Sequence, residues 1–169
     1  MATRATTHIL RALLPPACLM LAGCLVAERS GTLPILTMTT VQLYYHNPAM
    51  RPAQLGGGRC SEEHVFPVER TIAGTQMPIY DALWFLIRGD LTDEERQAGF
   101  QTAFPLRGLE LRGAVLEDGL LTVEFDDPYR QTCGGVCRVK LLRAQVEKTA
   151  RQFPGVESVR ILPQDVFQP

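Results

Sequence analysis

The stretch "LELRGAVLEDGLLTVEFDD" (109–127) constrains the fold of this 169-residue chain more than any other part of the sequence. Two runs in which apolar and polar residues alternate flank Asp118 and Gly119. Alternation is typical of β-strands with one buried face, and an Asp-Gly pair accommodates the positive φ angles of a tight turn. The sequence therefore predicts a β-hairpin. The residues of its second strand that are expected to face the core are Leu121, Val123 and Phe125.

Two main helices are predicted, one before this hairpin and one after it. The first lies in "TQMPIYDALWFLIRGD" (75–90), where apolar residues recur at helical spacing. Pro78 suits its first turn, and Gly89 suits a left-handed C-terminal cap. The second lies in residues 134–155. The residues of its apolar stripe are Val136, Val139, Leu142, Val146, Ala150 and Phe153.

Shorter elements complete the domain. Further strands are expected at 41–47, 64–72 and 156–162. Pro67 places the second of these at a sheet edge or a bulge, because proline cannot donate a ladder hydrogen bond. Thr92 and Glu95 form a capping-box pattern, which favours a short helical turn. The order β-β-α-β-β-α-β predicts a single α+β domain, with a mixed or antiparallel sheet and both main helices on one face.

The N-terminus has the layout of a secretory leader. Arg4 and Arg11 precede a mostly apolar stretch at residues 12–21, which is shorter than the roughly 20 apolar residues of a membrane-spanning helix. The stretch ends in Leu21-Ala22-Gly23-Cys24, the pattern of a bacterial lipobox. An ordinary signal peptide followed by a chance cysteine is the alternative. We expect a lipoprotein signal peptide at 1–23, with the lipid on Cys24.

This N-terminus predicts an extracytoplasmic protein anchored to a membrane. Several acyl chains would hold it stably, since each buried methylene contributes about 0.8 kcal/mol. Residues 24–39 are then a lipidated tether, and residues 40–169 are the folded domain. Loss of the leader changes the net charge from −1 to −3, because Arg4 and Arg11 are removed. No basic run remains, so a nucleic-acid partner is not expected.

Three cysteines remain after the leader and the lipidated cysteine are set aside: Cys60, Cys133 and Cys137. The number is odd, so at least one thiol has no partner within the chain. Cys60 could form a disulfide with either of the other two. Cys133 and Cys137 could form a thiol–disulfide centre at a helix start, where a thiol pKa is lowered. Together with Cys60, they and His64 also make a valid set of zinc ligands, although a Cys-x3-His spacing is generic.

Other candidate sites are weaker. Tyr44, Tyr45 and His46 could form a binding surface for peptidoglycan or a small ligand, with one of the two tyrosines in the core. The acidic residues Glu124, Asp126 and Asp127 at the end of the hairpin could bind a cation or pair with Arg130, but we interpret them as a solvated strand end. The sequence has no Gly-x-Ser-x-Gly nucleophile motif and no phosphate-binding loop. We therefore expect no enzymatic activity, no cofactor and no metal.

Five stretches together resemble successive landmarks of the GerM-type domain, a family named for a sporulation and germination lipoprotein. They are "VFPVERTI", "ALWFLIRGDLTDEERQAGFQTAFP", "LEDGLLTVEF", "GGVCRV" and "RQFPGVESVRIL". The resemblance runs from about Val41 to the C-terminus. It implies a fold similar to the ring-building domains of envelope assemblies, and a non-enzymatic scaffold or adaptor that is secreted or lipid-anchored.

One subset of this family resembles the chain further, with a cysteine before "VFPV" and another in "GGxCRV". These positions match Cys60 and Cys137, so the resemblance implies a disulfide between them. Cys133 has no general counterpart in the family and is expected to be a free thiol.

These observations predict a membrane-anchored lipoprotein that works as a binding or assembly module of the cell envelope, with a sporulation-related role as the finer family expectation. Its expected partners are membrane lipid, through the acyl groups on Cys24, and an envelope protein or a second copy of the chain. Thiol–disulfide exchange through Cys133 and Cys137, and ligand binding at Tyr44 and Tyr45, are the alternative hypotheses.

Overall fold

The computed structural model of the chain describes residues 37–50 and 60–168. Its elements are β1 (Met38–His46), the short 3-10 helix η2 (Glu62–His64), β2 (Val65–Ala73), α1 (Pro78–Arg88), α2 (Asp93–Gln97), β3 (Glu110–Glu117), β4 (Leu120–Asp126), α3 (Val136–Arg151) and β5 (Ser158–Leu162). This order confirms the predicted α+β class. The first strand begins at Met38, so the last residues of the expected tether are already part of the domain. The expected leader and Cys24 lie outside the described residues.

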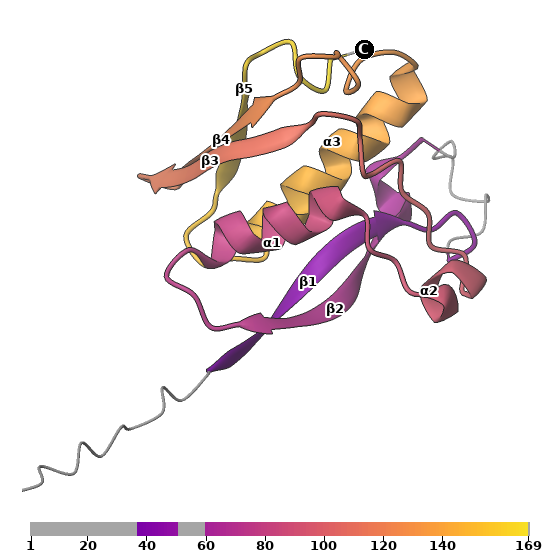
Figure 1. The fold of residues 1–169 in the computed structure, drawn as a ribbon, viewed down its shortest axis with the longest axis horizontal. Coiled ribbons are helices and arrows are strands. Elements are labelled where there is room, and N and C mark those ends of the chain that lie inside the picture. Colours follow the sequence, from indigo (N-terminus) through magenta and orange to yellow (C-terminus); the bar gives the residue numbers. More distant parts are fainter. Residues whose placement is uncertain (1–36, 51–59, 169) are drawn as a thin grey trace, which may run out of the picture. The chain divides into compact units, whose positions relative to one another are not determined.

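The five strands form two small sheets, where the sequence suggested one. β1 pairs with β2 in an antiparallel hairpin. In the second sheet β4 is central, antiparallel to β3 and parallel to β5. Figure 1 shows α1 and α3 side by side between the two sheets. Pro67 lies on β2, whose only strand partner among the described residues is β1, and this confirms the predicted edge position.

The two helices supply the centre of the core. The inner face of α1 is fully or almost fully buried and consists of Ala82, Leu83, Leu86 and Ile87. The predicted stripe of α3 is buried from Val139 to Ala150, but Val136 is exposed. Val136 is the first residue of the helix and lies one turn before the part of α3 that packs into the core. Each fully buried Val or Leu contributes about 1.5–3 kcal/mol relative to an exposed side chain.

The predicted turn and cap residues have the expected geometry. Asp118 and Gly119 have φ angles of 47° and 80°, and they connect β3 to β4. Gly89 ends α1 with a φ of 68°, where a Cβ atom would collide with the carbonyl oxygen of Phe104. Thr92 and Glu95 form both hydrogen bonds of the capping box at the start of α2. Within 37–50 and 60–168, no helix has the length and apolar character needed to cross a membrane.

A disulfide joins Cys60, just before η2, to Cys137 in the first turn of α3. This is the pairing that the family resemblance implies, and Cys133 is a free thiol. The two bridged residues are 77 positions apart. By the chain-entropy model, closing a loop of this length in the unfolded state contributes about 4.5 kcal/mol.

Replacing both bridged cysteines with alanine should lower the free energy of unfolding by about 2–5 kcal/mol, because the unfolded chain regains the entropy of the open loop. Urea denaturation of the oxidised protein measures the difference. The matched control is Cys133→Ala, which should change the free energy of unfolding by only about 0.5 kcal/mol. Equal losses in the two variants would contradict a stabilising role for the bridge.

Candidate functional site

The structure does not bring the three thiols together as a reactive or metal-binding centre. Cys137 is bonded to Cys60, so it is not available to Cys133 as a dithiol partner. The thiol of Cys133 donates a hydrogen bond to the Asp165 carbonyl at 3.7 Å and accepts one from Arg130 at 3.9 Å. Among the residues that the structure describes, no group of three or more His, Cys, Asp or Glu side chains could hold a metal ion. The zinc hypothesis is therefore not supported by the geometry.

The suggested surface of Tyr44, Tyr45 and His46 does not form. Tyr45 is 0 % exposed and belongs to the core, because this side of β1 packs against the helices. Tyr44 is half-buried and donates its hydroxyl to Gln42 Oε1 at 3.1 Å. His46 is half-buried, and its ring meets that of His64 edge-on at 6.4 Å between centroids. Alternation predicts one tyrosine in the core and the other exposed; the first is confirmed by Tyr45, whereas Tyr44 is only half-exposed. A ligand could not reach Tyr45.

Tyr45 lies next to an ion pair that joins β2 to α2. Both terminal nitrogens of Arg70 donate to the carboxylate of Glu95 at 2.6 Å, and Arg70 also donates to the Asp90 carbonyl at 2.9 Å. The hydrogen bonds from Arg70 lower the pKa of Glu95 below its usual value. Burial raises the pKa of Tyr45 far above its usual value, so its hydroxyl stays neutral. Arg70 therefore ties β2 to α2 and to the turn before it, and the neutral Tyr45 side chain fills the core.

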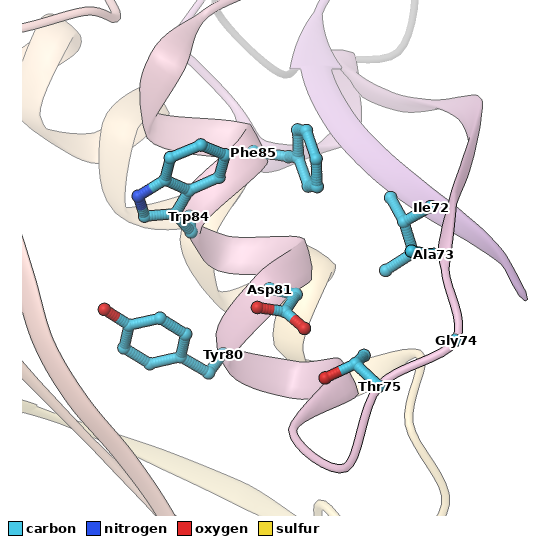
Figure 2. A pocket seen from close by; sticks show the side chains of 8 residues that line it. All are labelled: Ile72, Ala73, Gly74, Thr75, Tyr80, Asp81, Trp84 and Phe85. Atoms are coloured by element: carbon cyan, nitrogen blue, oxygen red, sulfur yellow. The ribbon is translucent and has the colours of Figure 1, made fainter. Parts of the chain in front are cut away.

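A groove of about 360 Å³ lies between the end of β2 and α1. The strand side of this α1 groove consists of Ile72, Ala73, Gly74 and Thr75, and the helix side consists of Tyr80, Asp81, Trp84 and Phe85. Figure 2 shows Phe85 on the flank of α1 that faces Ile72, whereas the rings of Tyr80 and Trp84 project from the opposite flank. The walls are mostly apolar, and Asp81 is the only charged residue among them.

The side chain of Trp84 lies on the solvent-facing side of α1. It is 38 % exposed, although the inner face of the same helix is buried. The Phe85 ring meets it edge-on at 5.0 Å, and the Arg88 guanidinium lies 4.7 Å from its centroid. Tyr80, one turn earlier, is fixed by a hydrogen bond from its hydroxyl to the Leu111 carbonyl at 3.1 Å. A second hollow of about 500 Å³ lies on the other flank, also lined by Tyr80, Trp84 and Arg88.

Sequence reasoning placed Trp84 in a helix but gave it no role. The signal was present, because Tyr80, Trp84 and Arg88 recur every four residues and lie off the apolar face. What the sequence could not supply is the strand wall of the groove, which depends on where β2 ends relative to α1. The resulting surface can bind an apolar group. Its lining residues contain no nucleophile paired with a base.

A family model described as "Sporulation and spore germination" and named Germane matches residues 42–164. The match covers well over half of the chain. The chain belongs to the Germane family. No curated protein and no solved structure gives a significant match to it. The Germane domain therefore includes β1 from Gln42 onward, the disulfide, the α1 groove and every later element.

The ion pair between Arg70 and Glu95 should make the Germane domain sensitive to acid. Because the pKa of Glu95 is lower in the folded state than in the unfolded state, the pair stabilises the fold fully above the unfolded value of about 4.3. This contribution is lost as the pH falls through the folded pKa. Glu95→Gln should cost about 1 kcal/mol at pH 7 and weaken the fall in stability between about pH 5 and pH 3.

Urea denaturation across this pH range measures the effect. Glutamine can still accept the capping-box hydrogen bond, so the variant tests the charge and not the helix cap. Glu117→Gln, on the exposed end of β3, is the matched control and should leave the profile unchanged. Identical pH profiles for the wild-type protein and Glu95→Gln would rule out the pair as the source of acid sensitivity.

Proposed function

We propose that this chain is an extracytoplasmic lipoprotein, anchored to a membrane through Cys24, whose Germane domain is a non-enzymatic binding or assembly module of the cell envelope. The leader pattern in residues 1–23 supports the location. The disulfide between Cys60 and Cys137 is compatible with it, because such bonds persist in oxidising compartments. The family description supports sporulation or spore germination as the setting of this role.

The observation that carries the binding role is the exposed Trp84 between two hollows on α1. Tryptophan is enriched among the residues that contribute most to binding, because it buries a large area at a small cost in side-chain entropy. A concave, mostly apolar surface beside such a residue is typical of a binding site.

Several side chains that could have taken part in chemistry or binding have structural roles. Cys137 is part of a disulfide, and Tyr45 fills the core. Asp127 accepts hydrogen bonds from the Gln131 and Thr132 backbone nitrogens and from the Thr132 hydroxyl. Burial alone would raise the pKa of Asp127, but these hydrogen bonds together lower it. The carboxylate therefore holds the loop before α3, and this use favours a binding module over an enzyme.

Anchoring is tested by Cys24→Ser in the full chain, expressed with its leader. We expect the wild-type protein in the membrane fraction with acyl groups on its N-terminal cysteine, detected by mass spectrometry. The variant should lose the acyl groups and leave the membrane fraction, because the thiol that receives the lipid is gone. Cys18→Ser changes the other cysteine of the N-terminal segment and should behave as wild type. A wild-type protein without acyl groups would contradict the proposal.

Assembly is tested by chemical cross-linking of the anchored protein in cells, followed by mass spectrometry of the products. The proposal expects a reproducible product that joins the Germane domain to one envelope protein or to a second copy. Sedimentation of the purified protein gives an independent measure of self-association. A strict monomer that also forms no cross-linked product at its natural abundance would contradict an assembly role.

A further inference from the structure

The chain enters the folded domain directly beside the α1 groove. The Gly74 nitrogen, in the strand wall of the groove, donates a hydrogen bond to the carbonyl of Thr37, the first described residue. Met38 pairs with Ala73, another wall residue. In Figure 1 the start of β1 and the connection from β2 to α1 lie at the same end of the domain. An anchor on the N-terminal segment would therefore be connected to the domain beside the α1 groove.

The same end exposes large apolar side chains. Met38 is 57 % exposed and Met77, at the start of α1, is 59 % exposed. We define the anchor-side surface as these two methionines, the α1 groove and Trp84, which lines the groove. Residues 37–45 and 71–80, which contribute Met38, Met77 and the strand wall, contain no Asp, Glu, Lys or Arg, whereas 21 % of the whole chain is charged. Asp81, on the helix wall, is the charged residue of the groove.

The number of residues between Cys24 and Thr37 limits the distance between an anchored Cys24 and the anchor-side surface. Thr37 is 13 positions after Cys24, and a segment of that length cannot span more than about 45 Å even when fully extended. Anchoring therefore confines the start of β1 to within about 45 Å of the anchored residue, which gives the anchor-side surface a high effective concentration of lipid.

From this placement we infer that the anchor-side surface rests on the lipid bilayer that carries the anchor, with Trp84 at the level of the headgroups. The inference rests on the proposed anchoring through Cys24. Tryptophan favours the membrane interface because its ring is apolar and its indole nitrogen is polar. The methionines present apolar surface to lipid without the desolvation cost of a charge.

The charged residues Arg88 and Asp81 limit how deeply the anchor-side surface can enter the bilayer. Arg88 stacks on Trp84, and its long side chain can keep the guanidinium among lipid phosphates while its methylenes lie lower. Asp81 lines the groove and would be costly to place among acyl chains. The domain therefore lies on the interface and does not enter the hydrocarbon layer.

Trp84 is the only tryptophan of the chain, so its fluorescence reports on this surface without any label. The acylated protein is reconstituted into phosphatidylcholine–phosphatidylglycerol vesicles, and flotation shows separately that it is anchored. We expect the emission of Trp84 to shift to shorter wavelength relative to the unacylated Cys24→Ser protein in solution. Lipids brominated near the headgroup end of the acyl chains should quench it at least twofold.

Two variants test whether this surface makes the contact. Met38→Gln combined with Met77→Gln removes apolar surface without adding charge, and it should reduce the quenching by half or more. Circular dichroism should show that the fold is intact. Val115→Gln is the matched control, because Val115 is 56 % exposed but lies on β3, and it should leave the quenching unchanged.

The outcomes separate this inference from the proposed function. Protein that floats with the vesicles but shows neither shift nor quenching overturns the inference and leaves the anchoring intact. Protein that does not float overturns both. Equal loss of quenching in the methionine and Val115 variants overturns the choice of surface. A photo-cross-linker at position 77 that captures a protein in cells, and no lipid, shows that this surface docks a protein instead.

Discussion

The packing of α1 against α3 connects two small sheets, neither of which would be stable by itself. The hairpin of β1 and β2 has only two strands, and an isolated two-stranded hairpin is marginally stable in water. The second sheet has three short strands with one apolar face, lined by Leu121, Val123 and Phe125 from β4. Both sheets cover the helix pair from opposite sides, and α1 and α3 contact β1 as well as the second sheet. The position of α1 also fixes the helix wall of the groove.

Local sequence signals predicted individual elements well because their causes are local. Asp118 and Gly119 adopt positive φ angles, which a short polar side chain tolerates and the absence of a Cβ atom permits. Gly89 caps α1, and the capping box starts α2. The same signals could not tell which strands share a sheet. That choice depends on contacts between residues far apart in the sequence, so the single predicted sheet became two. The local signals also did not show that Val136 is exposed, because the apolar stripe of α3 begins one turn before the part of the helix that packs into the core.

The candidate site was predicted less well for the same reason. Alternation showed that Tyr44 and Tyr45 face opposite sides of β1, but only the packing of the helices decides which side is buried. Three cysteines left more than one pairing open until the first turn of α3 was placed beside Cys60. The α1 groove needs the end of β2 beside an exposed helix face, and neither segment alone carries that information. Trp84 was visible in the sequence as an aromatic residue off the buried face, but its neighbours were not.

The disulfide between Cys60 and Cys137 has a mechanical consequence for a chain held at its N-terminus. Tension on the N-terminal segment acts first on β1, the element that follows it, and tends to slide this strand along β2. If β1 detaches, the chain can extend only as far as Cys60, where the covalent link to α3 takes the load. The closed loop of residues 61–136, which contains β2, α1, α2, β3 and β4, then carries no tension along its backbone. The bridge therefore limits how much of the domain can be unfolded by tension on its N-terminal segment.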